Sequence, residues 1–144
     1  MTDIFIDTDV IIDFLVDRKP FSREAAIIFT LIEQKKLKGY TSSLTFSNLY
    51  YVLRKVEAHN KVISKLDSLS KMLSILKAEE QTIIKALASG FSYFEDSIQY
   101  FSAKENRKID AIITRNTKDF KNSEIPVMTP GDYLKTSGSF GGIR

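Results

Sequence analysis

Apolar residues follow two patterns along this chain: short runs bounded by polar residues, and longer stretches in which they recur at helical spacing. The runs at 4–6 and 109–114 are nearly unbroken, as in strands of a parallel sheet covered on both faces. Shorter strands are predicted at 40–42, 74–76 and 125–128. The last is expected at a sheet edge, because Pro126 has no backbone N–H to donate.

Helices are predicted wherever apolar residues recur at i, i+3, i+4 and i+7, as Ala25, Ile28, Phe29 and Ile32 do. Asp9 is the expected N-cap of the first helix, and Gly39 is expected to end the second. Phe94, Ile98 and Phe101 are expected to be buried by a later helix. The predicted helices cover approximately residues 10–15, 22–38, 46–53, 62–72, 79–87, 95–105 and a final turn from 130.

Strands that alternate with helices predict an α/β fold, a three-layer α/β/α sandwich around a mainly parallel central sheet. The length of 144 residues is that of one domain. We expect this domain to span residues 1–136. The Gly- and Ser-rich segment 137–144 is expected to be a flexible tail.

Composition narrows the class of protein. Hydrophobic residues make up 43% of the chain and charged residues 27%, as in ordinary globular proteins. The absence of cysteine excludes disulfides and thiolate zinc sites. No signal peptide is recognisable and no apolar run approaches the roughly 20 residues of a membrane span, so we expect a cytoplasmic protein without a membrane partner. The net charge of +3 is compatible with a polyanionic partner.

Polar residues that follow the predicted strands are the candidates for chemistry, since sites of parallel α/β sheets lie beyond the carboxyl ends of the strands. Asp7 ends the first strand, Asn116 and Asp119 follow the late strand, and Asp96 opens the helix before it. Carboxylates that converge repel one another unless a cation lies between them. Asp7, Asp96 and Asp119 therefore predict a site for Mg²⁺ or Mn²⁺ that activates water against a phosphodiester.

Each acid also has a simpler structural interpretation. Asp7 could cap a turn, Asp96 could be a first-turn acid favoured by the helix dipole, and Asp119 could bond its own backbone. Asp13 is expected to be a surface acid or one that supports the site. Asn48 lies mid-helix, where a buried polar contact is the alternative to a role in the site.

Four segments follow one another along the chain in a recognisable order. They are Phe5-Ile6-Asp7-Thr8-Asp9-Val10-Ile11-Ile12-Asp13, Thr41-Ser42-Ser43-Leu44-Thr45-Phe46-Ser47-Asn48-Leu49-Tyr50-Tyr51, Phe94-Glu95-Asp96-Ser97-Ile98-Gln99 and Thr114-Arg115-Asn116-Thr117-Lys118-Asp119-Phe120. Together they resemble the PIN domain family, the fold of many bacterial toxin ribonucleases of the VapC type. No single segment is specific, but the four together, with their spacing over nearly the whole chain, are fairly specific.

The resemblance implies a Mg²⁺- or Mn²⁺-dependent endoribonuclease. The family's first and late acids fall on Asp7 and Asp96, and its final pair falls on the turn that holds Asn116 and Asp119. Thr8 and Thr114 match hydroxyls that line the site. Single-stranded or loop RNA is the expected substrate, since its bases are accessible, and Arg115 is expected to contact its backbone. The resemblance also implies an antitoxin protein and a homodimer as partners.

Two positions depart from the commoner toxin pattern. Asn48 stands where the middle helix usually supplies Glu, and Asn116 stands where the late turn usually supplies Asp. The chain resembles more closely a PIN subgroup with Asn-Leu-Tyr-Tyr and Thr-Arg-Asn-x-x-Asp-Phe motifs. An amide can ligate through its oxygen but adds no negative charge, so these positions weaken the predicted metal site.

Two other hypotheses stay open at this point. A degenerate PIN domain would bind RNA or a protein partner without cutting, as Asn48 and Asn116 suggest. A phosphatase resembling the haloacid dehalogenases would use the Asp7-Thr8-Asp9 segment, with one Asp as nucleophile, and would need Lys118 or Lys121 downstream.

Overall fold

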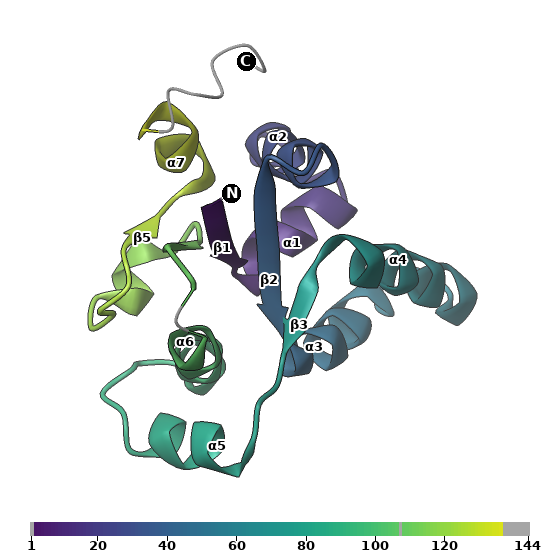
Figure 1. Cartoon of the computed structure of the whole chain (residues 1–144). Helices are drawn as coiled ribbons and strands as arrows, with labels where there is room; N and C mark the ends of the chain where they lie inside the picture. Colours follow the sequence, from purple (N-terminus) through teal and green to yellow (C-terminus); the bar gives the residue numbers. More distant parts are fainter. Residues whose placement is uncertain (1, 107, 137–144) are drawn as a thin grey trace.

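The computed structural model of the chain describes residues 2–106 and 108–136 (Figure 1). Its centre is a five-stranded sheet in the order β3-β2-β1-β4-β5, and every neighbouring pair is parallel. The predicted parallel sheet is therefore confirmed, with the first strand at its centre. The strands are β1 (Thr2–Ile6), β2 (Leu37–Ser42), β3 (Ser74–Leu76), β4 (Ala111–Ile113) and β5 (Val127–Met128).

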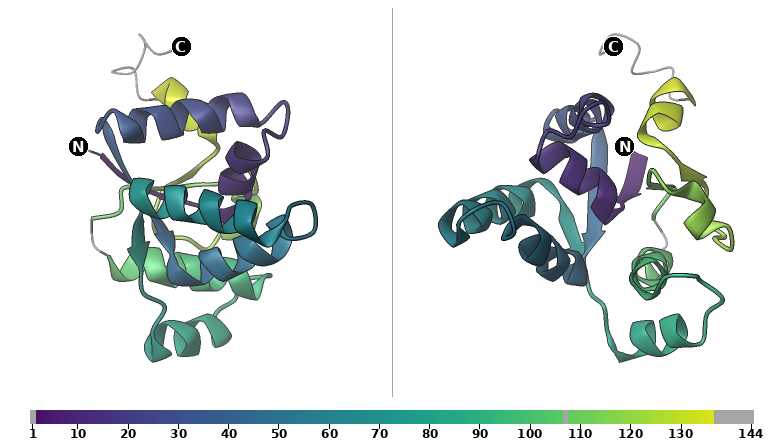
Figure 2. Two further views of the ribbon diagram at one scale, coloured as in Figure 1. Left: turned by 90° about the vertical axis from the view of Figure 1, so that its right-hand side faces the viewer. Right: turned by 180° about the vertical axis from the view of Figure 1, so that it is seen from behind.

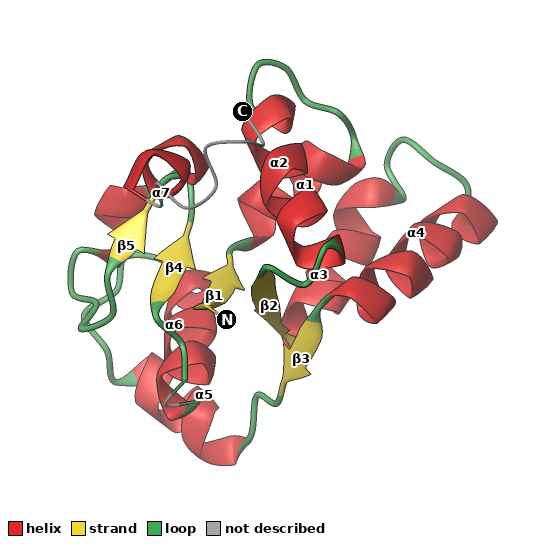
Figure 3. Cartoon of the chain, turned by 45° about the horizontal axis from the view of Figure 1, so that its top comes forward, coloured by secondary structure: helices red, strands yellow, loops and turns green. Residues whose placement is uncertain are grey.

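Helices cover both faces of this sheet (Figures 2 and 3). Those along the first half of the chain, α1 to α4, lie on one face, α5 and α6 lie on the other, and α7 packs against α2 beside the β5 edge. The helical elements are α1 (Thr8–Leu15), α2 (Ser22–Glu33), α3 (Ser43–Leu53), α4 (His59–Met72), α5 (Glu80–Leu87), α6 (Phe94–Glu105), the 3₁₀ helix η1 (Thr117–Phe120) and α7 (Pro130–Thr136).

Alternate side chains of β1 build the two cores that join these layers. Ile4 and Ile6 pack into a core shared with α1 to α4, and Phe5 packs into a second core with Tyr100 of α6 and Phe120 of η1. The run at 4–6 is apolar at every position because both faces of the strand are covered there. This is the three-layer arrangement that the pattern of elements predicts.

Three local predictions are wrong. Helix α2 ends at Glu33, and Gly39 lies inside β2 opposite Ile4, with Ile32 and Leu73 closing over it. Asp7, rather than Asp9, caps α1, because its carboxylate accepts the Thr8 N–H. Phe94 is half exposed on the first turn of α6 rather than buried. The edge position of β5 is confirmed.

Within the described residues, no helix combines the length and apolarity that crossing a bilayer requires. The predicted tail, 137–144, lies outside the described residues.

Gly39 offers a test of the packing around β2. A Cβ placed there would lie 2.6 Å from the Ile32 Cδ1 and Leu73 Cδ2 atoms, both in the core. We expect Gly39→Ala to lower the free energy of unfolding by about 1–3 kcal/mol, since buried side chains must shift to admit the methyl group. Urea denaturation measures this. The same substitution at Gly90, where the nearest atom is 3.4 Å away, serves as control and should change it by less than about 0.5 kcal/mol. Equal effects at the two glycines would contradict the packing described.

Candidate active site

A cleft of about 510 Å³ opens at the carboxyl ends of the central strands. Its walls come from the start of α1, the middle of α3, the first turns of α6 and the turn after β4. Among the residues that line it are Asp7, Thr8, Asp9, Asn48, Asp96, Gln99 and Asn116. The topology therefore brings together residues that are more than 100 positions apart in the sequence.

Asp7 is the most strongly held acid of the cleft. Its Oδ1 accepts hydrogen bonds from the Thr8 backbone N–H at 2.7 Å and from Gln99 Nε2 at 2.6 Å, and its Oδ2 accepts one from the Thr114 hydroxyl at 2.7 Å. Burial raises the pKa of this carboxyl, and these hydrogen bonds oppose the rise because they stabilise the anion. Asp7 is thus fixed in position before any ligand arrives.

Gln99 is a site residue that sequence reasoning missed. It is buried on α6, donates to Asp7, and accepts from the Thr8 N–H and hydroxyl through its Oε1, both at 3.2 Å. It therefore joins α6 to the start of α1. The available signal was its spacing: Gln99 lies three residues after Asp96, on the same helix face.

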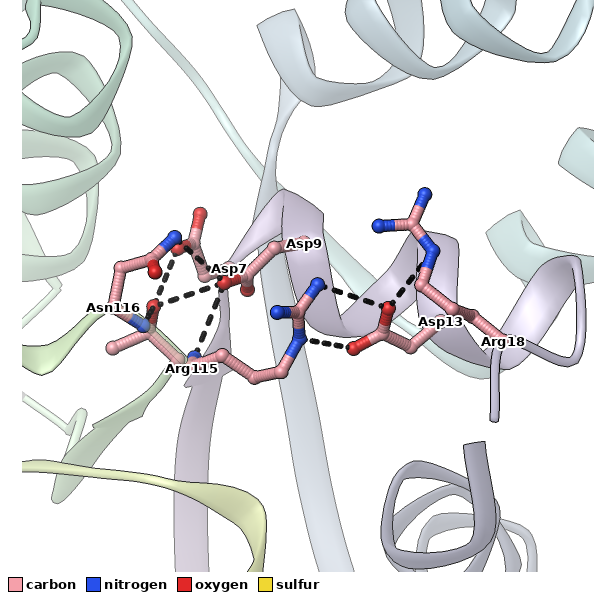
Figure 4. Close-up of polar contacts among 7 residues, drawn as sticks. Asp7, Asp9, Asp13, Arg18, Arg115 and Asn116 are labelled. Atoms are coloured by element: carbon pink, nitrogen blue, oxygen red, sulfur yellow. Dashed lines mark hydrogen bonds and ion pairs between the residues drawn. The ribbon is translucent and has the colours of Figure 1, made fainter. Parts of the chain in front are cut away.

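Asp9 also belongs to the site, although it was expected to be only a cap. Its Oδ2 accepts hydrogen bonds from the Arg115 backbone N–H at 3.2 Å and from Asn116 Nδ2 at 3.3 Å (Figure 4). Its Oδ1 is buried and has no hydrogen-bond partner among the described residues. Burial, followed by the charge of Asp7, raises the pKa of Asp9 to about 7. One oxygen of the Asp9 carboxylate is therefore left without a hydrogen bond among the described residues.

Asp96 is linked to the other acids through charge. Burial raises its pKa to about 7, and the negative charges of Asp7, Asp119 and Glu95 contribute further. Asp119 lines an adjoining hollow of about 760 Å³ that also includes Asp96, Asn116 and Lys118. The predicted acids therefore face connected spaces, Asp7 and Asp96 in the cleft itself and Asp119 beside it.

Arg115 points away from this cleft. Its Nε and Nη2 bond the Asp13 carboxylate at 2.6 and 3.2 Å, and its guanidinium carbon lies 4.0 Å from the centre of the Phe21 ring. Figure 4 shows the side chain running along α1, away from Asn116 and toward Asp13. Asp13 is only 1% exposed and also lies 3.7 Å from Arg18 Nε. It is a buried acid rather than a surface one, and it orients the turn on which Thr114 and Asn116 lie.

The oxygen donors of the cleft are carboxylates and side-chain amides, the ligand types that a hard divalent cation prefers. Within residues 2–106 and 108–136, no three acid or imidazole side chains are grouped closely enough to hold one ion among themselves. Mg²⁺, however, is commonly bound by one or two carboxylates, with waters and substrate phosphates completing its shell. Raised carboxyl pKa values and the unpartnered Asp9 Oδ1 are what such a site shows without its cation. The residues fit the ion on these terms.

Comparison with known proteins gives four relevant similarities, two in sequence and two in structure. The family model described as "PIN domain" matches residues 3–118. The chain is 27% identical over 137 residues to Ribonuclease VapC1 of Aquifex aeolicus (strain VF5), covering 92% of this chain and 93% of that protein. Among solved structures it resembles a chain of DNA-bound VapBC from Salmonella typhimurium, with a TM-score of 0.65 at 19% identity over 90% of this chain and 99% of that one.

A second structural neighbour is a chain of a toxin-antitoxin complex from Klebsiella pneumoniae. Its TM-score is 0.64 at 24% identity, and the match covers 88% of this chain and 97% of that one. At such identities the structural similarities establish the fold, which agrees with the α/β sandwich described above.

The raised pKa of Asp96 predicts how stability depends on pH. Its pKa is about 7 in the folded protein against an ordinary 3.8, so its favourable contribution is complete below about pH 4 and is lost as pH rises through 7. In EDTA, we expect Tm to fall between pH 5.5 and pH 8. Asp96→Asn, which cannot ionise, should melt higher than the wild type at pH 8 by on the order of 2–4 °C.

Differential scanning calorimetry at both pH values provides the measurement. The exposed Asp67, paired with Lys71 on α4, supplies a matched Asp67→Asn control whose pH dependence should parallel that of the wild type. Mn²⁺ should restore the Tm of the wild type at pH 8 but not raise that of Asp96→Asn. Parallel pH profiles for all three proteins would contradict the raised pKa.

Proposed function

This chain belongs to the PIN domain family, and from that membership and its acidic cleft we propose that it is a divalent-metal-dependent endoribonuclease. The observation that carries the proposal is that Asp7, Asp9 and Asp96 line one cleft beyond the carboxyl ends of the strands. Burial raises the pKa of all three carboxyls, and the charge of Asp7 raises those of Asp9 and Asp96 further. The similarity to Ribonuclease VapC1 supports RNA as the substrate.

The proposed ligands of Mg²⁺ or Mn²⁺ are Asp7 and Asp96, and Asp119 either ligates the ion or holds a water beside it. The ion, when bound, lowers the pKa of water and stabilises charge at the phosphorus. Gln99 and Thr114 fix both oxygens of Asp7, so little reorganisation is needed when an RNA phosphate enters. Thr8, which is held by Gln99, lies beside this carboxylate.

Asn48 and Asn116 are proposed to position phosphate or water through their side-chain amides. Both line the cleft. Two acids at these positions would have added negative charge to the cleft, and the amides do not. Asp9 is proposed to supply part of that charge, because it accepts a hydrogen bond from Asn116 and its other oxygen has no partner among the described residues. Arg115 is proposed to act chiefly through its ion pair with Asp13, which holds the turn after β4 in place. The outer edge of the Arg115 guanidinium is proposed to contact the RNA backbone.

A toxin role is proposed with the same support. The structural neighbours include VapBC proteins and a toxin-antitoxin complex, so we propose an antitoxin protein as a partner of this chain. A homodimeric assembly and cytoplasmic RNA as the target are proposed from the family resemblance alone. The match to the PIN domain model argues against the phosphatase hypothesis. The remaining alternative is a PIN domain that binds RNA or a protein without cutting, which the two asparagines favour.

The first test is cleavage of a mixed RNA pool. We expect the wild type to cut with Mn²⁺ and not with EDTA, and Asp96→Asn to be slower by on the order of 100-fold, because one ligand charge is lost. Asp67→Asn should cut at the wild-type rate. Cleavage that survives in Asp96→Asn would mean a contaminant or a different site. Metal-independent, salt-sensitive RNA binding without any cleavage would favour the binding module.

The compensating role of Asp9 has its own test. We expect Asp9→Asn to weaken Mn²⁺ binding at pH 7.5 by about 10-fold, because the substitution removes one negative charge from the cleft. The oxygen concerned, Asp9 Oδ1, has no hydrogen-bond partner among the described residues. Isothermal titration calorimetry measures the affinity, and Asp67→Asn is again the matched control. Unchanged Mn²⁺ affinity in Asp9→Asn would contradict a role of Asp9 in binding the ion. Its role would then be limited to the hydrogen bonds that hold the turn at Arg115 and Asn116.

A further inference from the structure

Two neighbouring aromatic side chains lie exposed at the start of α6. Tyr93, the N-cap residue, is 60% exposed, and Phe94, the first residue of the helix, is 49% exposed. The buried positions of α6 run from Ser97 onward, so its first turn extends beyond the core. We refer to Tyr93 and Phe94 as the aromatic ledge. Adjacent exposed aromatic rings have a hydration cost that a bound ligand would relieve.

The ledge is continuous with the acidic cleft on two sides. Phe94 lines a hollow of about 250 Å³ between α3 and α6, which shares Asn48 and Gln99 with the cleft. Tyr93 and Phe94 together line the larger hollow, which shares Asp96 and Asn116 with it. A chain whose phosphate lay at Asp96 would therefore carry its neighbouring groups onto the ledge.

The smaller hollow has the composition of a pocket for a flat heteroaromatic ring. Leu44, Phe94 and Ile98 supply apolar surface, and the amides of Asn48 and Gln99 lie at the side nearest the cleft. The buried Thr45 also lines it, and the Thr45 hydroxyl has no hydrogen-bond partner among the described residues. A nucleobase combines the same two requirements, an apolar face and an edge that forms hydrogen bonds.

Lysine side chains lie beside the hollows, where the phosphates of a bound polynucleotide would continue past the cleft. Lys118 of η1 lines the larger hollow together with the ledge. On the opposite side of the cleft, Tyr51 is 69% exposed, and Lys55 Nζ lies 4.9 Å from the centre of its ring. Aromatic surface interleaved with lysine is the arrangement by which proteins hold single-stranded nucleic acid.

We propose that the aromatic ledge stacks the bases of single-stranded RNA beside the phosphate to be cut, and that Phe94 seats one base in the hollow between α3 and α6. This rests on the proposed ribonuclease function and specifies its substrate as RNA with unstacked bases. In a duplex each base is stacked on its neighbours and its face is hidden, so paired RNA cannot use the ledge. Lys118 contacts the adjoining phosphate.

The test is RNA binding in EDTA, where a metal-dependent enzyme cannot cut. Fluorescence anisotropy with a short single-stranded oligoribonucleotide compares the wild type with Phe94→Ala, Phe94→Tyr and Leu87→Ala. Leu87 is a matched control, since it is an exposed apolar residue of α5 that lines none of the hollows described. We expect Phe94→Ala to bind about 10-fold more weakly, as one base–aromatic stack is lost, while Phe94→Tyr and Leu87→Ala bind like the wild type.

An abasic substitution shows whether Phe94 contacts a base. Removing one base from the oligoribonucleotide should weaken wild-type binding at one position and should have no further effect on Phe94→Ala, because the two changes remove the same stack. Additive losses would overturn the proposal. A duplex of the same sequence should bind Phe94→Ala and the wild type equally.

The outcomes separate this proposal from the ribonuclease function. If the wild type cuts RNA but Phe94→Ala binds single strands unchanged, the ledge proposal is overturned and the function stands. If no cleavage occurs and Phe94→Ala still loses affinity, the ledge stands without the nuclease. A changed oligomeric state of Phe94→Ala with unchanged RNA affinity would assign the ledge to a protein interface and overturn the proposal.

Discussion

The burial of the Asp7 carboxylate at the end of the central strand is the constraint on which the site depends. A charged group there is tolerated because donors from three elements meet it: the first turn of α1, Gln99 of α6 and Thr114 after β4. These donors lie at the junction of both helical layers with the sheet. The same hydrogen bonds therefore hold the acid ready for chemistry and join the two halves of the fold.

Negative charge gathered in this cleft opposes stability. Asp9 and Asp96 each have a pKa near 7, which means that their ionisation at neutral pH weakens the folded state when no cation is bound. The protein relieves part of this by bonding Asp9 to the Arg115–Asn116 turn and Asp13 to Arg115. The remaining repulsion is what a divalent cation would remove, so binding and stability are linked in the same residues.

The spacing of apolar residues was sufficient to predict most helices and strands, but it gave the wrong result at a few residues. The helices α3 to α5 follow from periodicity, because their buried residues recur at helical spacing along one face. Gly39 resembles a helix stop in the sequence, yet it is a strand residue because Ile32 and Leu73 need the space of its missing side chain. Phe94 continues the apolar pattern of its helix, but the first turn of α6 extends beyond the core.

The sequence by itself determined the α/β class, the parallel sheet and the positions of Asp7, Asp96 and Asn116 at element ends, because strand ends and helix starts are set by local chemistry. Only the tertiary structure decided that Asp9 and Gln99 join them, that Arg115 turns toward a buried Asp13, and that Tyr93 and Phe94 remain exposed beside the cleft. The first two of these features depend on contacts between residues about 90 to 107 positions apart, such as Gln99 with Asp7 or Arg115 with Asp9. Periodicity carries no information about such pairs, since they arise only when the strand order places β4 and α6 beside the end of β1.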